Sequence, residues 1–350
     1  MIKTINLYLS DYNWEKFGIA NNSILFKPKY MEVNVDWSNY KEVKSLSLPF
    51  IFVEYRNGTI VNIEVNAGVI RAVPIFYSLS EKHCLISDSV EQLIKITGTK
   101  ELNELSVAEL LSFGYATDNK TLINGIKCLQ AGEILSVDKD KVNIETAYLY
   151  NSLKLENKPL KEFKKELKVI TEDIFNDLIS TLKGKTAVVP LSGGLDSRFI
   201  LAMLYMGGVK DVVTFSWGIP NSDDVKIGKA VADKLGYEWY YIPHTKATWE
   251  SVFESDWFLD CLSYTFKYTS ISGFASLPFL KYLKEKYLSR KEFDNSNFVF
   301  LPGHTGDFIS GGHIPSAIWN ADSLNEIVGY VLQKHCLWNK PSIKSINEEI

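Results

Sequence analysis

The sequence predicts two domains of different class: an α+β domain with an antiparallel sandwich over residues 1–150, and an α/β domain with a parallel sheet over residues 151–350. In the first half, short β-rich runs are separated by turn residues, as in antiparallel sheets. From residue 186 onward, strand-like runs alternate with segments of helix length, as in a parallel sheet. A chain of 350 residues also exceeds the usual size of one hydrophobic core. The polar stretch 151–159 marks the expected join.

The first domain is predicted from its β-branched and aromatic runs. Residues 50–55 and 59–61 flank Asn57 and Gly58, and two β-rich runs around Asn-Gly predict a hairpin. Further along the chain we expect the antiparallel sheet to continue at 69–77 and 84–88. We expect a helix to begin at 106–111.

An amphipathic helix is expected to lead into the second domain, because apolar residues recur at helical spacing between Leu160 and Leu182. Three strands separated by two helices then follow, in the order 187–190, 199–204, 212–217, 225–235 and 239–242. Ligands of such sheets bind beyond the carboxyl ends of the strands. Ser192 and Trp217 fall at two of those ends.

The turn after the first of these strands has the composition of a phosphate-binding loop. A helix that begins directly after two glycines leaves backbone N–H groups free to gather an anion. We expect Gly193 and Gly194 to take positive φ and approach a polyphosphate closely, with Ser192 and Ser197 adding hydroxyl donors. Asp196 is acidic and would repel phosphates unless a divalent cation bridged them. The expected ligand is therefore a magnesium nucleotide.

This loop lacks the Lys-Ser/Thr ending of the Walker A pattern and the spacing of the dinucleotide fingerprint. Through the run Ser-Gly-Gly-Leu-Asp-Ser it resembles the pyrophosphate-binding loop of the N-type ATP pyrophosphatases. The resemblance implies cleavage of ATP between its α and β phosphates, giving AMP and pyrophosphate. Ser, Gly and Asp are also common turn residues, but the strand before the loop and the helix after it favour the binding interpretation.

A second glycine-rich motif follows an expected strand at 298–301. The two motifs together resemble the synthetase domain of the asparagine synthetases, whose second motif reads Gly-Glu-Gly-x-Asp-Glu-x-x-Gly-Gly. The pattern is kept at Gly303, Asp307, Gly311 and Gly312, and altered at His304, Thr305 and Phe308. The resemblance implies that backbone near Trp217 and Gly303 contacts the adenosine of ATP.

Asp196 and Asp307 are two carboxylates that could flank one Mg²⁺ ion, a hard cation that prefers oxygen ligands. His304 stands where the resemblance implies a glutamate close to the acceptor carboxylate and the amine. It is interpreted either as a general base or as a hydrogen-bonding structural histidine on a glycine turn. We favour contact with the substrate, and we expect His304 and Asp307 to be the catalytic residues.

The first domain resembles the glutaminase-like domain of the same family, which implies a fold of the N-terminal-nucleophile type. Residues 121–133 are similar to the phrase Thr-Leu-x-x-Gly-Ile-x-x-Leu-x-Ala-Gly-Glu that ends that domain. The family's mature chains begin with a nucleophilic cysteine, whereas this sequence begins with Met1 and its first cysteine is Cys84. We therefore expect a degenerate glutaminase domain, as in the β-lactam synthetases, in a resemblance that covers roughly positions 45 to 320.

Composition and charge argue against nucleic acid and membranes as partners. The formal net charge of −4 gives no basic surface for nucleic acid. We also expect no membrane-spanning segment and no leader, and hence a cytoplasmic enzyme. The cysteines lack metal-site or disulfide spacing and are expected to be reduced thiols that pack as small apolar residues: Cys84, Cys128, Cys261 and Cys336.

The predicted function is that of an ATP-dependent, amide-forming carbon–nitrogen ligase of asparagine synthetase type, using ATP and Mg²⁺. A substrate carboxylate attacks the α-phosphate, and ammonia or an amino group then takes the acyl group. The acceptor could be aspartate, as in asparagine biosynthesis, an amino-acid-derived carboxylate, a peptide side chain or a sugar acid.

A second interpretation has the chain bind ATP without catalysis, as a scaffold or as one half of a split synthetase. Asparagine synthetases extend well past their second motif, and that extension carries a lysine that stabilises the adenylating transition state. This sequence ends at Ile350, and no such lysine can be assigned in it. The second domain is therefore expected to be incomplete at its C-terminus, and a second subunit could supply the missing segment.

Overall fold

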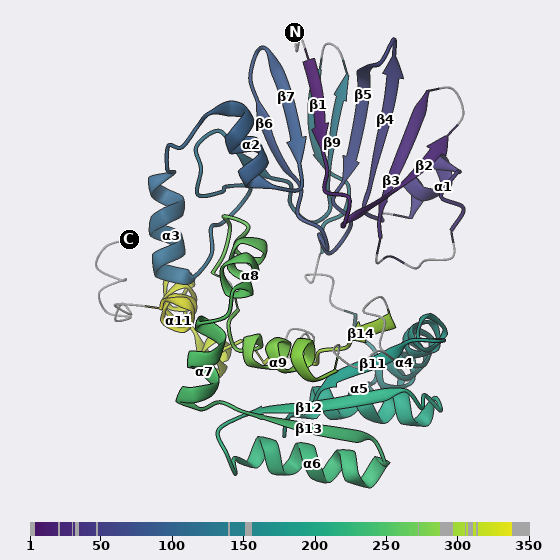
Figure 1. The fold of residues 1–350 in the computed structure, drawn as a ribbon, viewed down its shortest axis with the longest axis vertical. Helices are drawn as coiled ribbons and strands as arrows, with labels where there is room; N and C mark the ends of the chain where they lie inside the picture. Colours follow the sequence, from purple (N-terminus) through teal and green to yellow (C-terminus); the bar gives the residue numbers. More distant parts are fainter. Residues whose placement is uncertain are drawn as a thin grey trace. The chain divides into compact units, whose positions relative to one another are not determined.

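The computed structural model describes residues 4–19, 22–29, 31, 35–46, 48–138, 141–150, 156–271, 273–287, 297–304, 306, 311–312 and 314–337. These residues form two compact units (Figure 1). The first unit holds the described residues up to 150, together with Tyr264–Ile271 and 335–337. The second unit holds the described residues of 156–263 and 273–334. The predicted limits of 1–150 and 151–350 thus differ from the units in assigning 264–271 and 335–337 to the second domain.

The first unit contains two β-sheets. The larger sheet is antiparallel throughout, in the order β10-β9-β5-β4-β3-β2. Its strands are β2 (Trp14–Ile19), β3 (Ser23–Pro28), β4 (Phe50–Arg56), β5 (Thr59–Asn66), β9 (Glu133–Asp138) and β10 (Val142–Thr146). The smaller sheet has the order β1-β7-β6-β8, with β1 and β7 parallel. Its strands are β1 (Thr4–Tyr8), β6 (Phe76–Leu79), β7 (His83–Ser87) and β8 (Lys127–Cys128).

A shared hydrophobic core joins the two sheets, since Ile51 and Val65 of the larger sheet pack in one cluster with Ile5 and Ile86 of the smaller one. The outer face of the larger sheet packs with α1 (Tyr40–Ser45), and that of the smaller sheet packs with α2 (Val90–Thr97). A further helix is α3 (Glu104–Phe113). The first unit thus contains two packed sheets, and the parallel pair β1–β7 departs from the predicted antiparallel pattern. The likeness to a glutaminase-type sandwich stays a prediction.

The Asn57-Gly58 turn forms the predicted hairpin between β4 and β5, in which Arg56 pairs with Thr59. Both turn residues have positive φ, 53° and 74°, as the tight two-residue turn of a twisted hairpin requires. The predicted strand at 69–77 is wrong over most of its length, because only its last two residues belong to β6. Arg71 in that stretch and Gly68 directly before it have positive φ, and Ile70 is exposed, so the backbone turns instead of extending.

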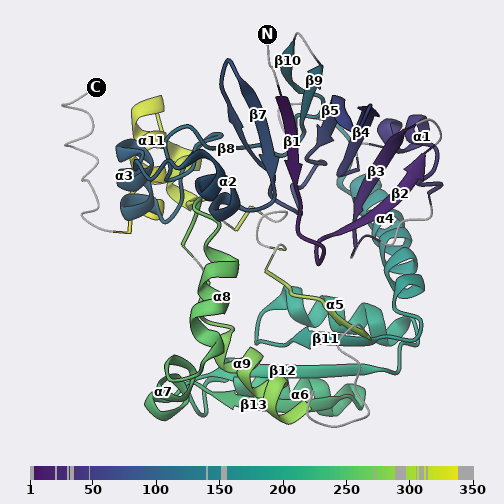
Figure 2. The same ribbon diagram turned by 45° about the horizontal axis from the view of Figure 1, so that its top comes forward.

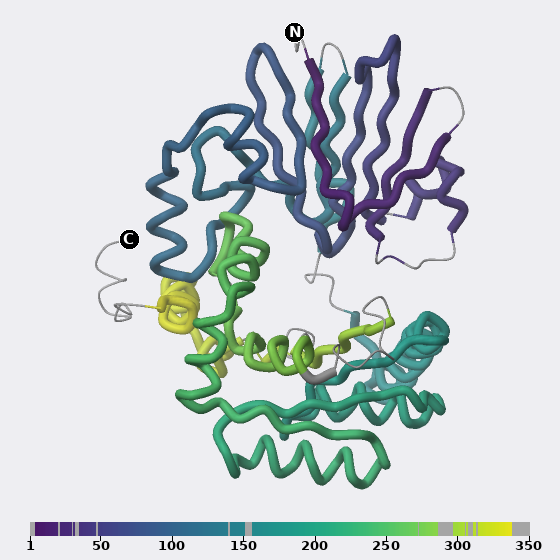
Figure 3. The backbone as a smooth tube through the Cα atoms, viewed as in Figure 1, coloured from purple at the N-terminus to yellow at the C-terminus, as the bar shows by residue number. Residues whose placement is uncertain are grey.

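The second unit is built on a parallel sheet of order β13-β12-β11-β14, formed as predicted by strands that alternate with helices. The strands are β11 (Thr186–Pro190), β12 (Val212–Gly218), β13 (Glu238–Pro243) and β14 (Phe298–Phe300). The helices between the first three strands are α5 (Leu195–Met206) and α6 (Asp223–Leu235). Figure 3 shows β11, α5, β12, α6 and β13 as successive passes of the chain, coloured from teal to green.

Helices cover both faces of this sheet. Ala187 and Val189 of β11 pack with Leu201 of α5 and Ala232 of α6. The alternate residue Val188 points to the other face, where it clusters with Phe279 of α9 (Leu277–Tyr282). This alternation across β11 gives a strand that is buried on both sides, as parallel strands are. The remaining elements are α7 (Lys246–Phe253), α8 (Trp257–Phe266), η1 (Leu283–Tyr287), η3 (Ser316–Asn320) and α11 (Leu324–His335).

The predicted amphipathic helix is α4 (Leu160–Thr181). Its C-terminal end packs on the core of the parallel sheet through Leu178 and Ile179, followed by the buried Leu182. The apolar side chains of its earlier turns are exposed, including Leu160, Phe163, Leu167, Ile170 and Ile174. Among the residues that the structure describes, no helix is both long enough and apolar enough to cross a membrane.

Ser216 of β12 ties the neighbouring strands together at the carboxyl edge of the sheet. Its buried hydroxyl donates to the Leu191 carbonyl oxygen at 2.7 Å and accepts from Trp239 Nε1 at 2.9 Å. Leu191 is the last residue before the glycine loop. The residue before that loop is therefore hydrogen-bonded to a polar side chain of the adjacent strand.

We expect Ser216→Ala to lower the free energy of unfolding by about 1–3 kcal/mol, because a buried carbonyl and an indole N–H each lose their partner. Chemical denaturation of the purified chain measures this. Ser251→Ala removes a hydroxyl of an exposed residue of α7 and should change the same quantity by less than about 0.5 kcal/mol. Equal losses in the two variants would contradict the role given to Ser216.

Candidate functional site

The candidate site lies at the carboxyl ends of three adjacent parallel strands. Ser192 follows β11, Trp217 and Gly218 end β12, and Gly303 follows β14. Because β11 pairs in parallel with both β12 and β14, these ends meet at one edge of the sheet. Figure 2 shows β11, β12 and β13 as adjacent strands, with α5 beside β11. The fold therefore brings together the two motifs that the sequence singles out.

The glycine loop is held by hydrogen bonds between its own residues. The Ser192 N–H donates to Ser197 Oγ at 3.1 Å, and the Gly194 N–H donates to Ser192 Oγ at 3.1 Å. The two hydroxyl oxygens lie 3.2 Å apart, so one of the hydroxyls can donate to the other. Ser197 is buried whereas Ser192 is exposed. The serines that the sequence predicts as phosphate donors thus also shape the loop.

Gly194 is the N-cap residue of α5, and no side chain caps this helix. The helix therefore begins with backbone amides and the positive end of its dipole next to the loop. The prediction of positive φ at Gly193 and Gly194 is wrong, since Gly194 has φ −70° and neither residue is left-handed. Glycine is needed at 193 for space instead, because a Cβ there would lie 2.8 Å from Asp224 Oδ1 and 3.3 Å from its Cα.

The second motif packs directly on the first. A Cβ added to Gly303 would lie 2.7 Å from the Ser197 nitrogen and 3.1 Å from the Asp196 carbonyl carbon. A Cβ added to Gly306 would overlap the Asp196 carboxylate. The Gly306 N–H also donates to the Gly303 carbonyl oxygen at 3.1 Å, which closes a turn that carries His304. This turn therefore lies against the first turn of α5 and its acidic side chain.

The predicted catalytic and metal-binding residues are His304, Asp196 and Asp307. His304 is exposed, in the turn that packs on α5. Asp196 is half-buried, with its carboxylate against Gly306. Asp307 lies outside the described residues, as do Thr305 and Phe308. Within the described ranges, no group of three or more His, Cys, Asp or Glu side chains gathers as a metal site.

Trp217 is half-buried and stacks on Phe279, with ring centroids 5.5 Å apart and planes 29° apart. Its indole belongs to the core under α9, so its backbone is the part that lies on the edge of the sheet. The neighbouring Gly218 carbonyl accepts hydrogen bonds from the His244 N–H at 2.9 Å and from the Tyr241 hydroxyl at 3.1 Å. The backbone contact between this strand and an adenosine stays a prediction.

His244 is bound to the same edge of the sheet through its backbone N–H. Burial lowers the pKa of its imidazole, and a hydrogen bond with the Ala275 backbone acts in the opposite direction. Its Nε2 is buried and has no hydrogen-bond partner among the residues that the structure describes. We therefore expect the ring to be neutral at pH 7.

The structure adds one residue that the sequence motifs do not contain. Asp224 Oδ1 accepts a hydrogen bond from the Gly193 N–H at 2.9 Å, across 31 positions of sequence. In the sequence, Asp223 and Asp224 look like acids that suit the N-terminus of a helix. Only the folding of α6 beside the loop shows that one of them reaches the glycine amide.

Part of the chain matches the model of a known protein family. Residues 184–335 match the asparagine synthase family model. The match extends from the start of β11 to the end of α11, and so it contains both motifs. No curated protein matches the sequence. The chain is also similar to a solved NH3-dependent NAD synthetase from Campylobacter jejuni in complex with nitrate, at 12% identity and a TM-score of 0.26, over 49% of this chain and 92% of that one.

The asparagine synthase match supports the predicted synthetase domain, and the parallel sheet that bears it fits a nucleotide-binding domain. The match does not cover residues 1–183. The glutaminase likeness of the first unit and its lack of a nucleophilic cysteine stay predictions. Cys84 and Cys128 of that unit are poor nucleophiles. Burial raises the pKa of Cys84 to about 12 and that of Cys128 to about 11, so both are protonated at pH 7.

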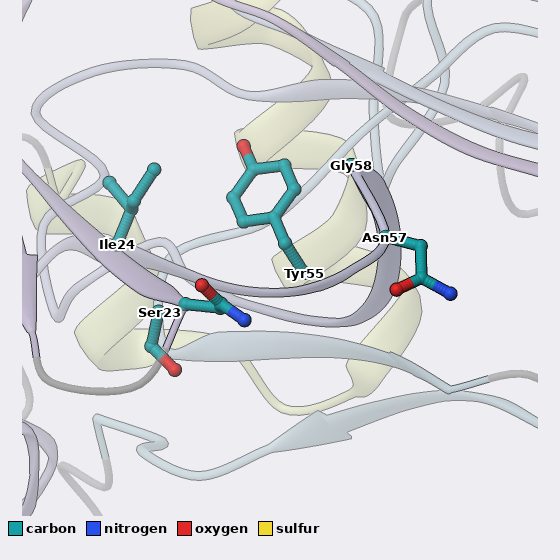
Figure 4. A pocket seen from close by; sticks show the side chains of 6 residues that line it. Ser23, Ile24, Tyr55, Asn57 and Gly58 are labelled. Carbon is teal, nitrogen blue, oxygen red and sulfur yellow. The ribbon is translucent and has the colours of Figure 1, made fainter.

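A surface hollow of the first unit lies near the hairpin turn, lined by Asn22, Ser23, Ile24, Tyr55, Asn57 and Gly58. Figure 4 shows the Tyr55 ring between Ile24 and Gly58. The lining residues offer amides and hydroxyls but no charged side chain. The hollow contains none of the predicted site residues, and so we assign it no part in the asparagine synthase domain.

Two glycine variants test the packing of the second motif on the asparagine synthase loop. We expect Gly303→Ala to lower the free energy of unfolding by about 1–3 kcal/mol, because its methyl group meets the Ser197 backbone, which cannot move aside. Gly306→Ala meets the Asp196 side chain, which can rotate away, and should cost less. Chemical denaturation compares the two variants.

Gly273→Ala is the matched control, since a Cβ there meets no atom within 4 Å among the described parts of the chain. It should change the free energy of unfolding by less than about 0.5 kcal/mol. A Gly303→Ala variant as stable as this control would contradict the packing described above.

Proposed function

We propose that this chain is an ATP-dependent ligase that adenylates a substrate carboxylate, releases pyrophosphate and transfers the acyl group to ammonia or an amino group. The observation that carries the proposal is the packing of the Gly303–Gly306 turn on Asp196 and Ser197. That contact joins two motifs, separated by more than a hundred residues, at the N-terminus of an uncapped helix. The asparagine synthase match over both motifs supports it.

The glycine loop supplies the anion site in this proposal. The amides in the first turn of α5 and the exposed Ser192 hydroxyl would bind the β- and γ-phosphates of ATP, because an uncapped helix N-terminus favours negative charge. The backbone at Trp217 and at Gly303 would bind the adenosine. Each of these groups lies on the carboxyl edge of the same parallel sheet, where ligands of such sheets bind.

Asp196 is suited to hold a Mg²⁺ ion in this site. Its carboxylate is half-buried beside an anion-binding loop, where its charge needs a cation for compensation. Asp307, one residue after Gly306, is the second proposed ligand. When bound, Mg²⁺ would supply neutralisation of the charge on the phosphates. The chain's own contribution is to orient the triphosphate and to stabilise the leaving pyrophosphate through its amides.

The proposed reaction has two steps. A carboxylate oxygen attacks the α-phosphorus of ATP, the bond to the β-phosphate oxygen breaks, and pyrophosphate leaves. A neutral amine then attacks the acyl carbon of the adenylate, AMP leaves with the carbon–oxygen electron pair, and the amine loses a proton. His304 is exposed in the turn against α5, and we propose that it contacts the acceptor or the amine.

The first unit is proposed to be a glutaminase-like fold that does not hydrolyse glutamine. The protonated state of Cys84 and Cys128 at pH 7 supports this, because a thiol rather than a thiolate is a weak nucleophile. The nitrogen would then be supplied as free ammonia or as an amino group. We propose a cytoplasmic location for such an enzyme.

A second candidate function is an ATP-binding scaffold, or one half of a split synthetase completed by another subunit. The observation that favours it is the sequence of the second motif, which carries His304, Thr305 and Phe308 where the asparagine synthetase pattern has other residues. On this alternative the chain would bind ATP in the same loop and would release no pyrophosphate by itself.

Pyrophosphate release from ATP in the presence of Mg²⁺ and a panel of carboxylates and amines tests the proposed function. We expect release by the unaltered chain, and a loss of about 100-fold or more in Asp196→Asn, because charge compensation at the phosphates supplies much of the rate. Asp173→Asn, at an exposed position of α4, is the control and should retain full activity. ATP binding without any pyrophosphate release would favour the scaffold instead.

Incubation with glutamine tests the proposal for the first unit. We expect the purified chain to form glutamate no faster than buffer does, because the Cys84 and Cys128 thiols are buried and protonated at neutral pH. The measurement is glutamate formation between pH 7 and 8. Robust turnover that Cys84→Ser abolishes would overturn this proposal.

A further inference from the structure

The contact between Asp224 and the glycine loop has no part in the reaction proposed above. The Gly193 N–H is the first loop amide after Ser192, and its hydrogen bond goes to Asp224 Oδ1 at 2.9 Å. This amide is therefore turned towards α6 and away from any phosphate bound at α5. Because the Gly194 N–H donates to Ser192 Oγ, the phosphates are left with the amides in the first turn of α5.

The loop and α6 are also in close steric contact at this point. A Cβ on Gly193 would lie 3.3 Å from the Asp224 Cα and 3.3 Å from the Ile227 Cδ1. The main chain of the loop at Gly193 therefore lies close to the main chain of α6 at Asp224. A movement of Asp224 away from Gly193 would require the loop or the first turn of α6 to move.

Gly228 fixes α6 at a second point on the same side of the helix, one turn after Asp224. A Cβ on Gly228 would lie 2.5 Å from Ser216 Oγ and 3.1 Å from the Leu191 carbonyl oxygen. Leu191 is the residue directly before the loop, and Gly193 is the second residue of the loop. Helix α6 therefore contacts the start of the loop at two places, one at Asp224 and one at Gly228.

From these contacts we infer that Asp224 is a positioning residue for ATP, which fixes the loop by accepting the Gly193 N–H. The inference rests on the proposed function, because it concerns the same loop. Asp224 does not contact the phosphates itself; it holds the amides after Gly193 in the orientation that binds them. An alternative role, in which the carboxylate fills the anion site until phosphate displaces it, predicts the opposite effect of its removal.

The test compares Asp224→Ala with Asp224→Asn, and with Asp223→Ala as the matched control at an adjacent exposed acid. An asparagine side chain keeps an oxygen that can accept the Gly193 N–H, whereas alanine does not. We expect kcat/KM for ATP to fall by about 10- to 100-fold in Asp224→Ala, mainly through KM, as for loss of a hydrogen bond to a charged group. Asp224→Asn should recover most of it, and Asp223→Ala should match the unaltered chain.

Amide hydrogen exchange at Gly193, measured by NMR on the glycine-labelled full chain without nucleotide, gives a second result that does not require catalysis. We expect exchange about tenfold faster or more in Asp224→Ala, and near-unaltered exchange in Asp224→Asn and Asp223→Ala. If the unaltered chain released no pyrophosphate, the proposed function would fail. The exchange rates and the affinity for ATP, measured by calorimetry, would still decide the role of Asp224.

Three results would overturn the inference. Tighter ATP binding by Asp224→Ala would show that the carboxylate competes with phosphate. An Asp224→Asn variant as defective as Asp224→Ala would show that charge, and not the hydrogen bond, matters. Unchanged Gly193 exchange in Asp224→Ala would show that no tether exists.

Discussion

The parallel pairing of β11 with β14 is the constraint on which the candidate site depends. Thr186 pairs with Phe298 and Val188 with Phe300, and the Leu301 N–H extends the ladder to the Val188 carbonyl. Each strand therefore ends at the same edge of the sheet, and each is followed at once by a glycine-rich turn. The approach of Gly303 to the Ser197 backbone is a direct result of this register. Backbone hydrogen bonds thus determine which side chains meet.

Glycine acts in this site chiefly by leaving out a side chain. Gly193, Gly228, Gly303 and Gly306 would each place a Cβ within 3 Å of another atom, while none of them has positive φ. Elsewhere in the chain glycine and asparagine act through their conformational freedom, as in the Asn57-Gly58 turn. In the second unit, close approach allows two loops and two helices to share the edge of one sheet.

Local signals in the sequence were sufficient to predict the parallel domain, and insufficient for contacts made between distant segments. The strand at 212–217 was predicted because its β-rich run ends at Gly218 and Pro220, and the helix at 225–235 because Gly236 follows its helical spacing. The structure gives Gly236 a φ of 75°. The stretch 69–75 was mistaken for a strand, because its apolar residues resemble one and its positive φ values depend on how the chain turns.

The candidate site likewise contains residues that the sequence predicts and contacts that it does not predict. Ser192, Asp196 and Ser197 belong to a motif that can be read in the sequence, and the structure places them at one helix N-terminus. The bond between Asp224 and Gly193 could not be predicted, because it depends on α6 packing beside the loop. The same holds for the segment at 264–271, whose backbone pairs with residues 114–122 of the first unit through the Ala116 and Leu122 amides.

A crystal structure of the chain with Mg²⁺ and a non-hydrolysable ATP analogue tests the central claim most directly. The account predicts the triphosphate at the N-terminus of α5, with its oxygens within hydrogen-bond distance of the amides that follow Gly193, and with the Gly303–Gly306 turn still packed on Asp196. A nucleotide bound elsewhere, or a glycine loop that takes up no phosphate at saturating analogue, would contradict it.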